Sequence, residues 1–598
     1  MKKIISILLS AELALGCCAA LGEAPAAAPA AEETQQTHQI ETKQVPLYLG
    51  NVGRLPREVP LYFLDGVADM PYLNLPDLMD VEAQIAEALK TNTVLTGMWD
   101  EESQLYAILN TVNDSAVLFS FDMGTVIYTN FDTFAAESGQ NRLDILYHPG
   151  VNSKNQPELF KRTGDPLMNR PGNSQAIFLD EYQIPYAAQD GKYLLPLHTA
   201  LELTLCMPSA SIIQAYNGEA IFLGGPGMFV QEKRNDAGEN VLEKTELGEL
   251  YYGASGGQRS PEFAEYGLGE LCMELDHFYG LKDAHSISSF MELVARTDYY
   301  EQLASPDAAV ADQALVNLIH YYLDDLHSSY KYNSWLTGFD RELESRGYGF
   351  SSIMDSRYTT LYNSARARYY PDGWYYYQEV GNTAYVTFDD FQYDSDFDYY
   401  SLDLDDPKCV TDTVSLILYA HRKITREGSP IQRVVLDLSN NIGGQADAAV
   451  FVMGWFLGEA TVTNVNTFTG AQGTSQYAVD ANLDRVFDDK DYLAGDYALY
   501  CLTSPVSFSC ANLVPWVFKT SGLVTLLGTQ SGGGSCVVQY MTTAWGTVFR
   551  ISGYRRLAFV KNGSFYDVDR GVEPDVTLTK LSSFYDRQRL NQIMDEMY

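Results

Sequence analysis

The amino-acid sequence predicts an α/β protein with three parts: a strand-rich α+β N-terminal region, a helical layer and an α/β core. The core is indicated by the alternation of apolar strands and helices beyond residue 382. The helical layer is indicated by the spacing of apolar residues, which changes from about two to about 3.6 between residues 260 and 326. The chain has 598 residues, enough for several domains of roughly 150 residues each.

The composition indicates a globular protein and excludes some partners. Apolar residues make up 46% of the chain and charged residues 20%, which is ordinary for a globular protein. Basic residues number 40 and acidic residues 78, so the formal net charge is −38. This charge repels phosphate backbones and anionic lipid headgroups, and we therefore expect no nucleic-acid partner.

The first residues predict export from a bacterial cell. Lys2 and Lys3 precede an apolar run over residues 4–9, and small residues lead to Cys17. The pattern resembles the bacterial lipoprotein signal, which implies a signal peptide at residues 1–22, lipid on Cys17 and an extracytoplasmic location. An ordinary cleaved signal peptide with secretion is the alternative. The apolar runs are shorter than the ~18–20 residues of a membrane span, so the lipid is the only expected membrane contact.

Two regions separate this signal from the helical layer. Residues 23–44 are rich in Ala, Pro, Glu and Thr, which is typical of a spacer. Residues 45–225 predict short strands with helical insertions, the α+β N-terminal region. Within this region, residues 62–75 and 184–197 both run through an Asp-Gly turn, a strand and a helix start. This echo suggests tandem modules.

Residues 260–332 predict a helical cap, and residues 333–598 predict the α/β core. One apolar helical face in the cap is formed by Leu315, Leu318, Ile319, Tyr322, Leu323 and Leu326. Core strands are expected at residues 384–388, 433–438 and 497–503, and core helices at 411–421 and 446–457. The strand at 433–438 is nearly all apolar, which indicates a sheet covered on both faces.

Two strand-to-helix junctions of the core carry the residues that predict chemistry. Residues 437–444 read Asp-Leu-Ser-Asn-Asn-Ile-Gly-Gly, and the two glycines can turn backbone amides toward an oxyanion. At the second junction, Ser509 opens a helix after a Pro-containing turn, and the amide of Cys510 is free to donate. Taken alone, a tight turn and a serine helix cap would explain these residues.

Together the junctions resemble those of the C-terminal-processing and tricorn-type serine peptidases, whose core is similar to the ClpP and crotonase fold. The family pattern Asp-Leu-Arg-x-Asn-x-Gly-Gly is matched at residues 437–444, with Ser439 in place of Arg. The family's nucleophile segment, Ser-Ala-x-Glu, is matched from Ser509 with Asn512 in place of Glu. Two further family segments resemble residues 528–539 and 571–576, in the same order along the chain.

The resemblance implies a ClpP/crotonase-like peptidase core at residues 333–598, with Ser509 as the nucleophile. The amides of Gly443 or Gly444 and of Cys510 would form the oxyanion hole. Upstream, residues 323–328 are similar to the Leu-x-Asp-x-His-Thr segment that ends the family's helical cap.

The resemblance also implies the catalytic base. Family members with a Ser-Lys dyad carry Lys where this sequence has Ser535, and no Lys occurs at residues 520–560. The sequence therefore resembles the tricorn-like branch, whose base is His. We expect His327 to take the proton from the nucleophile, with a buried or capping role as the alternative. His421 ends a polar helix and is predicted to be solvated.

The acidic residue that would complete a catalytic relay with Ser509 and His327 is less clearly identified by the sequence. Tricorn-type enzymes place a carboxylate shortly before Gly-Val-x-Pro-Asp, where this chain has Asp567 and Asp569. We favour Asp569, with a solvated loop acid as the alternative. The stretch between His327 and residue 384 is too short for the PDZ domain that many members insert. No cofactor or metal is expected, and the six downstream cysteines lack zinc-site spacing. The sequence does not determine a disulfide pairing among them, and buried free thiols are the alternative.

The predicted function is a serine peptidase that hydrolyses peptide bonds of exported or cell-surface proteins, with peptides or unfolded proteins as substrates. One alternative is a non-catalytic surface lipoprotein that uses a degenerate peptidase fold to bind peptide or glycan, because Ser439 and Asn512 depart from the family pattern. A penicillin-recognising enzyme is a weaker alternative. Residues 328–331, 439–441 and 519–521 mimic its three motifs, but the middle one lies inside the glycine-containing segment.

Overall fold

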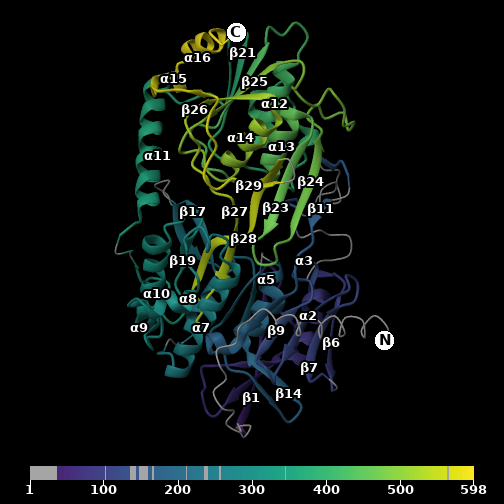
Figure 1. The fold of residues 1–598 in the computed structure, drawn as a ribbon, viewed down its shortest axis with the longest axis vertical. Coiled ribbons are helices and arrows are strands. Elements are labelled where there is room, and N and C mark those ends of the chain that lie inside the picture. Colours follow the sequence, from purple (N-terminus) through teal and green to yellow (C-terminus); the bar gives the residue numbers. More distant parts are fainter. Residues whose placement is uncertain are drawn as a thin grey trace.

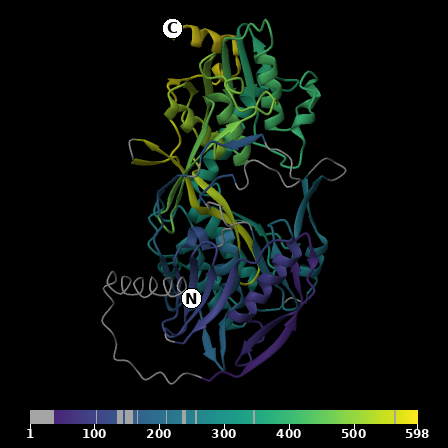
Figure 2. The same ribbon diagram turned by 90° about the vertical axis from the view of Figure 1, so that its right-hand side faces the viewer.

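A computed structural model gives the architecture of the chain (Figure 1). It describes residues 37–101, 103–134, 143–146, 159–164, 167–209, 212–234, 240–254, 257–343, 345, 347–561 and 564–597. The predicted signal peptide, Cys17 and most of the predicted spacer lie outside these residues. Figures 1 and 2 show the C-terminal core at one end of the molecule and the N-terminal region at the other.

The N-terminal region is built from small sheets. The first sheet has the order β1 (Ile40–Val45), β4 (Val59–Leu64), β5 (Tyr72–Asn74), β14 (Lys192–Pro196) and β13 (Ala187–Gln189). The second has the order β12 (Gln175–Phe178), β9 (Thr125–Tyr128), β8 (Ser115–Ser120), β7 (Leu105–Asn110) and β6 (Leu95–Asp100). The third has the order β15 (Ile213–Tyr216), β16 (Ile221–Gly224), β2 (Leu47–Leu49) and β3 (Gly53–Arg54). The first strand thus begins inside the range predicted for the spacer.

Helices and a hairpin complete this region. The helices are α2 (Leu75–Leu89), α3 (Phe131–Phe134), η1 (Leu179–Tyr182), α4 (Leu197–Leu201), the π-helix η2 (Glu202–Cys206), α5 (Met207–Ser209) and α6 (Glu246–Gly253). The hairpin is formed by β17 (Val230–Arg234) and β18 (Asn240–Lys244).

The two segments that echo each other in the sequence lie side by side in the first sheet. Asp65 and Asp190 occupy their turns with φ of 52° and 54°, and each is followed by a glycine with positive φ. The strands that follow, β5 and β14, pair antiparallel, with Asn74 opposite Leu194. Each strand leads directly into a helix, α2 or α4, so the repeated units share one sheet.

The helical layer contains α7 (Pro261–Phe278), α8 (Phe290–Ala295), α9 (Tyr299–Leu303), α10 (Ala308–Asn317) and the π-helix η3 (Leu318–Leu323). Helix α7 is buried over nearly all its length. The predicted apolar face of the last helix is wrong at Tyr322, which is 43% exposed. The wider π turn closes hydrogen bonds over five residues instead of four, so it rotates this side chain away from the face that Leu318 and Leu323 bury.

The core is a six-stranded sheet with helices on both faces. Its order is β20 (Tyr377–Val380), β21 (Thr383–Thr387), β22 (Arg433–Asp437), β25 (Ala498–Thr503), β26 (Val524–Gly528) and β30 (Val576–Thr577). All neighbours after β21 pair in parallel. The predicted strands and helices of this part are confirmed, and α13 has the bounds expected from the sequence.

The two faces of the core sheet pack against different helices. Ala384, Val434 and Cys501 belong to one apolar cluster with the helices α12 (Thr413–Ile424), α13 (Ala446–Leu457) and α14 (Cys510–Ser521). The alternate residues Tyr385 and Val435 face a second cluster with α11 (Phe350–Tyr369), α15 (Ser582–Tyr585) and α16 (Arg587–Asp595). Short 3₁₀ turns, η4 (Tyr399–Ser401) and η5 (Pro407–Cys409), precede α12. This two-sided burial explains the nearly all-apolar strands.

A second large sheet joins the core to the rest of the molecule. Its order is β10 (Phe160–Arg162), β24 (Gln472–Val479), β23 (Ala460–Asn466), β28 (Val548–Lys561) and β19 (Ser329–Tyr332). In addition β11 (Leu167–Arg170) pairs with β24, and β27 (Cys536–Thr542) and β29 (Ser564–Asp567) pair with β28. The N-terminal region and the predicted cap therefore both add strands to a sheet of the core, and β28 runs toward the N-terminal region (Figure 1).

Two further observations bear on the expectations from the sequence. Within the described residues, no helix combines the length and the apolar character that crossing a membrane requires. The six cysteines in this part of the chain are all buried and none forms a disulfide.

Candidate active site

Ser509 lies between strand β25 and helix α14, at the N-terminus of the helix. Its backbone has φ of 57° and ψ of −122°, a left-handed conformation that a serine adopts only when its surroundings impose it. Its N–H donates to the carbonyl of Gly533 at 2.9 Å. Its side chain makes no capping hydrogen bond to the helix, so the hydroxyl is not used as a helix cap.

The glycine pair lies directly against this serine. Gly443 and Gly444 have φ of 106° and 134°. A Cβ on Gly443 would lie 2.6 Å from the Cβ of Ser509, so only glycine permits this approach. The Gly443 N–H donates to the side-chain oxygen of Asn441 at 2.9 Å.

The amides of Gly444 and Cys510 remain available. Neither N–H has a hydrogen-bond partner within the part of the chain that the structure describes. The Cys510 thiol donates to the carbonyl oxygen of Gly444, with the two heavy atoms 3.1 Å apart, so the two segments are in contact. Of the two glycines, Gly444 therefore has the amide that an oxyanion could use.

His327 reaches the same place from the turn between η3 and β19. The backbone N–H of His327 donates to the Asp325 carboxylate at 3.1 Å, and its ring lies 4.7 Å from the ring of Phe508, centroid to centroid. The side chain is buried, yet its Nε2 has no hydrogen-bond partner among the described residues. Burial lowers the pKa of His327, and Arg550 lowers it further, while Asp325 and Asp569 act in the opposite direction.

These groups line one cavity of about 420 Å³. Its walls are formed by Leu326, His327, Asp355, Asp390, Ile442, Gly443, Gly444, Phe508, Ser509, Val538 and Arg550. No hydrogen bond between the Ser509 hydroxyl and His327 is present among the described residues. The structure thus brings the predicted nucleophile, base and glycines to one cavity. Nε2 of the His327 imidazole has no hydrogen-bond partner among the described residues.

Comparison with known families agrees with this arrangement. Residues 382–578 match the model of peptidase family S41. Residues 382–578, which make up most of the core, are therefore similar to a peptidase family S41 domain. The resemblance inferred from the sequence motifs is confirmed, whereas the tricorn-like branch stays a prediction.

The chain is also similar to solved structures of low sequence identity. The photosystem II D1 C-terminal processing protease is 19% identical with a TM-score of 0.25, over 33% of this chain and 42% of that protein. A lipoprotein from Streptococcus agalactiae is 13% identical with a TM-score of 0.33, over 56% of this chain and 97% of that protein. The tricorn protease is 10% identical with a TM-score of 0.30, over 84% of this chain and 58% of that protein. No curated protein sequence matches the chain.

Asp569 does not line this cavity, although its charge acts on His327. Its carboxylate accepts from the backbone N–H and the hydroxyl of Ser535, at 3.0 and 3.1 Å. Ser535, predicted from the sequence to stand where other family members carry a lysine, also accepts a hydrogen bond from Arg556 through its hydroxyl. Asp567 pairs with Arg556 instead. Among the described residues, neither aspartate is hydrogen-bonded to the imidazole of His327.

Ser439 and Asn512, which stand where the family pattern has Arg and Glu, brace loops of the core. Ser439 donates to Asp437 through its N–H and its hydroxyl, and the other oxygen of Asp437 accepts from Arg587 on α16 at 2.6 Å. Asn512 donates to the Val568 carbonyl at 2.7 Å and accepts from a neighbouring serine hydroxyl. Neither side chain lines the cavity.

The prediction that His421 is solvated is wrong. His421 is 4% exposed, and its Nδ1 accepts a hydrogen bond from the Trp455 indole at 3.1 Å. It lies on the face of α12 that Ile417 and Ile424 also bury, and this face packs against α13. Burial lowers its pKa to about 4.

Sequence reasoning missed three polar residues of the cavity. Asp355 lies on α11, Asp390 follows β21, and Arg550 lies on β28. Burial raises the pKa of Asp355. None of the three belongs to a family motif, and only Asp390 had a usable signal, since it follows a core strand as the two motif loops do.

Proposed function

We propose that this chain is a serine peptidase that hydrolyses peptide bonds of exported or cell-surface proteins. Ser509 is the nucleophile and His327 the base. The observation that carries the proposal is the strained backbone of Ser509 at a helix N-terminus, in contact with a glycine pair and facing the cavity that His327 lines. A residue held in a sparsely populated conformation beside a cavity points to function.

The first step is attack on the substrate carbonyl. The hydroxyl oxygen of Ser509 bonds to the carbonyl carbon while its proton passes to Nε2 of His327, which is buried and unpaired. Lowering of the pKa keeps this imidazole neutral at pH 7, as a base must be. The serine–histidine hydrogen bond is expected to form when substrate binds, since such bonds are often long in the free enzyme.

The amides of Gly444 and Cys510 stabilise the negative charge that develops on the substrate oxygen. Both N–H groups lack a partner among the described residues. Backbone donors that are already held in place stabilise the developing negative charge more strongly than water does. The protonated His327 then gives its proton to the leaving amine, and water hydrolyses the acyl-enzyme by the reverse sequence.

Asp569 completes the proposed relay as a positioned charge. The hydrogen bonds from Ser535 fix its carboxylate, and it favours the protonated form of His327 that arises during the reaction. Ser439 and Asn512 make structural hydrogen bonds away from the cavity, so their departure from the family pattern does not argue against catalysis.

The test is covalent labelling with a fluorophosphonate together with cleavage of an unfolded protein. We expect Ser509→Ala to abolish labelling and to lower the rate by about 10³-fold or more. Ser521→Ala, at the exposed C-terminal end of the same helix, is the matched control and should leave both unchanged. Full activity of Ser509→Ala would show that the nucleophile is wrong. Absence of labelling in the parent, with peptide binding retained, would instead favour a non-catalytic binding protein.

The same proposal includes export and a lipid anchor on Cys17. The support is the sequence pattern of the first residues, which lie outside the described part of the chain. Changing Cys17 and Cys18 together to alanine should release the protein from the membrane fraction of its host. Retention of the double variant in that fraction would refute the anchor.

A further inference from the structure

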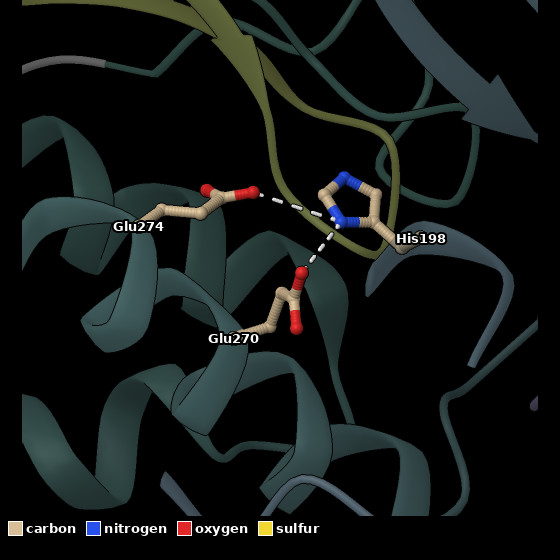
Figure 3. Close-up of side chains that lie close together, drawn as sticks. All are labelled: His198, Glu270 and Glu274. Carbon is tan, nitrogen blue, oxygen red and sulfur yellow. Dashed lines mark hydrogen bonds and ion pairs between the residues drawn. The ribbon is translucent and has the colours of Figure 1, made fainter. Parts of the chain in front are cut away.

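A second cluster of functional side chains lies outside the cavity, where three parts of the molecule meet. His198 comes from α4 of the N-terminal region, and Glu270 and Glu274 lie one turn apart on α7 of the helical layer (Figure 3). The imidazole Nε2 lies 3.4 Å from the hydroxyl of Thr542 on β27. Both glutamates are fully buried, and His198 is 7% exposed.

The ligand atoms of this cluster are arranged around one point. Nδ1 of His198 lies 3.3 Å from a carboxylate oxygen of Glu270 and 3.6 Å from one of Glu274. These three atoms all lie within 4.8 Å of one another. Figure 3 shows both carboxylates directed toward this nitrogen. Two ligands that each bind a metal ion at ~2.0–2.2 Å in tetrahedral geometry are themselves about 3.3–3.6 Å apart, so the two distances from Nδ1 of His198 fit a coordination shell.

Glu274 provides an independent observation. Neither of its carboxylate oxygens has a hydrogen-bond partner among the described residues, although both are buried. A buried carboxylate without a partner is strongly unfavourable unless it binds a proton or a cation. Glu270 differs, because its second oxygen accepts from the Thr199 hydroxyl at 2.6 Å.

The cluster is short of positive charge. A third buried carboxylate, Glu202, adjoins it, and one of its oxygens accepts from Gln214 at 2.9 Å. With a proton on Nε2 donated to Thr542, His198 would direct its Nδ1 lone pair at two carboxylates. A cation between them removes this repulsion.

We propose that His198, Glu270 and Glu274 form a structural site for a divalent transition-metal ion, and that Zn²⁺ is the expected ion. One imidazole nitrogen and two carboxylate oxygens are a donor set that Zn²⁺ accepts. Thr199 orients Glu270 from the second layer, and Gln214 bonds the His198 carbonyl at 2.8 Å. The ion would fasten α4 to α7, and its binding free energy would add to the stability of that junction.

The experiment measures metal in the purified full-length chain, prepared without chelators and with zinc in the growth medium. Elemental analysis should find about one zinc ion per chain. Removing the metal and adding Zn²⁺ back should raise the melting temperature in a concentration-dependent way. Co²⁺ should give the visible absorption bands of a low-coordinate nitrogen–oxygen site.

The variants separate a metal site from a proton-bound cluster. Glu274→Gln and His198→Gln should weaken Zn²⁺ binding by more than about 100-fold, and Thr199→Val, which keeps the ligands, by about 10- to 100-fold. Glu265→Gln, on the exposed side of the same helix, is the control and should bind as the parent does. If a glutamine variant fails to fold, Thr199→Val still tests the site.

The proposal is overturned if the parent holds no stoichiometric metal and neither Zn²⁺ nor Co²⁺ changes its melting temperature or spectrum. It is also overturned if Glu274→Gln is as stable as the parent and binds zinc equally well. Either result would mean that protons hold the buried carboxylates. All these readouts are independent of peptidase activity, so they do not depend on the proposed function.

Discussion

His327 and His421 are both buried, and burial lowers the pKa of both imidazoles. Their surroundings differ in two respects. His421 lies between α12 and α13 with a ring nitrogen bonded to Trp455, whereas Nε2 of His327 has no partner among the described residues and its ring lines a cavity. Burial alone therefore sets only the protonation state. An unpaired nitrogen on a ring that lines a cavity is what allows an imidazole to accept a proton from a serine.

The strongest test of this comparison is to remove each imidazole in turn. His327→Ala should lower kcat/KM by about 10³-fold or more with little change in melting temperature, because the proton acceptor is lost. His421→Ala should retain near-parental kcat/KM per folded molecule. The measurement is peptide cleavage with folding checked by circular dichroism. The reverse pattern would show that the base is not His327.

The second test concerns the glycine that contacts the nucleophile. Gly443→Ala should lower kcat/KM by about 100-fold, because a Cβ would lie 2.6 Å from the Cβ of Ser509 and the φ of 106° disfavours alanine. The matched control is Gly522→Ala at the C-terminal end of α14, where φ is 71° and no atom lies within 4 Å of the added Cβ. This control should lower stability by about 1 kcal/mol and leave activity intact. Equal activity of both variants would contradict the proposed contact.

The third test is the stability that the interface around His421 provides. His421→Ala should cost about 2–4 kcal/mol of unfolding free energy, from the cavity and the unpaired Trp455 indole. The native pKa of about 4 lies below the ordinary value of about 6.5. Above pH 6.5 the His421 imidazole is unprotonated in both the folded and the unfolded protein. As the pH falls toward 4, the unfolded protein binds a proton that the folded protein does not, so the free energy of unfolding decreases. Urea unfolding at pH 7 and pH 5 should show this loss in the parent and less of it in the variant.

The smallest expected effect is a shift of the acidic limb of the rate profile. Because the pKa of His327 is lowered, kcat/KM should fall at a midpoint below about 6.5. Arg550→Gln removes a positive charge and should move the midpoint up by about 0.5–1 unit, whereas Asp569→Asn should move it down. Arg589→Gln on the exposed side of α16 is the control. Midpoints that do not respond, or that lie above 6.5, would assign the limb to another group.

The sequence predicted the α/β core and the groups around Ser509 well, for a physical reason. Strands β22, β25 and β26 are parallel neighbours, so the loops at their carboxyl ends meet at one edge of the sheet. Motifs that are far apart in the chain but follow successive parallel strands can therefore be assigned to one site before a structure exists.

The remaining features depend on tertiary packing. The charged residues after His421 resemble a solvated helix end, whereas tertiary packing, including the contact with Trp455 on α13, buries the ring. The π turn that exposes Tyr322 has no sequence signal in a helical pattern. The cluster of His198 and Glu270 combines elements far apart in the chain, and the Glu270–Glu274 spacing alone is ordinary for a helix.

Strand β28 has a consequence for how this protein can be divided. The segment that matches the S41 model includes all of β28, yet its partner β19 and the base His327 lie before that segment. Apolar residues of β28 and of the turn and strand before it belong to the same core cluster as the N-terminal region: Met541, Trp545, Phe549, Ile551 and Tyr554. A chain that began at residue 382 would expose these apolar side chains to water and would lack the proposed base, His327. The segment that matches the S41 model is therefore shorter than the segment that can fold and act by itself. We expect limited proteolysis to release no active fragment of about residues 382–578.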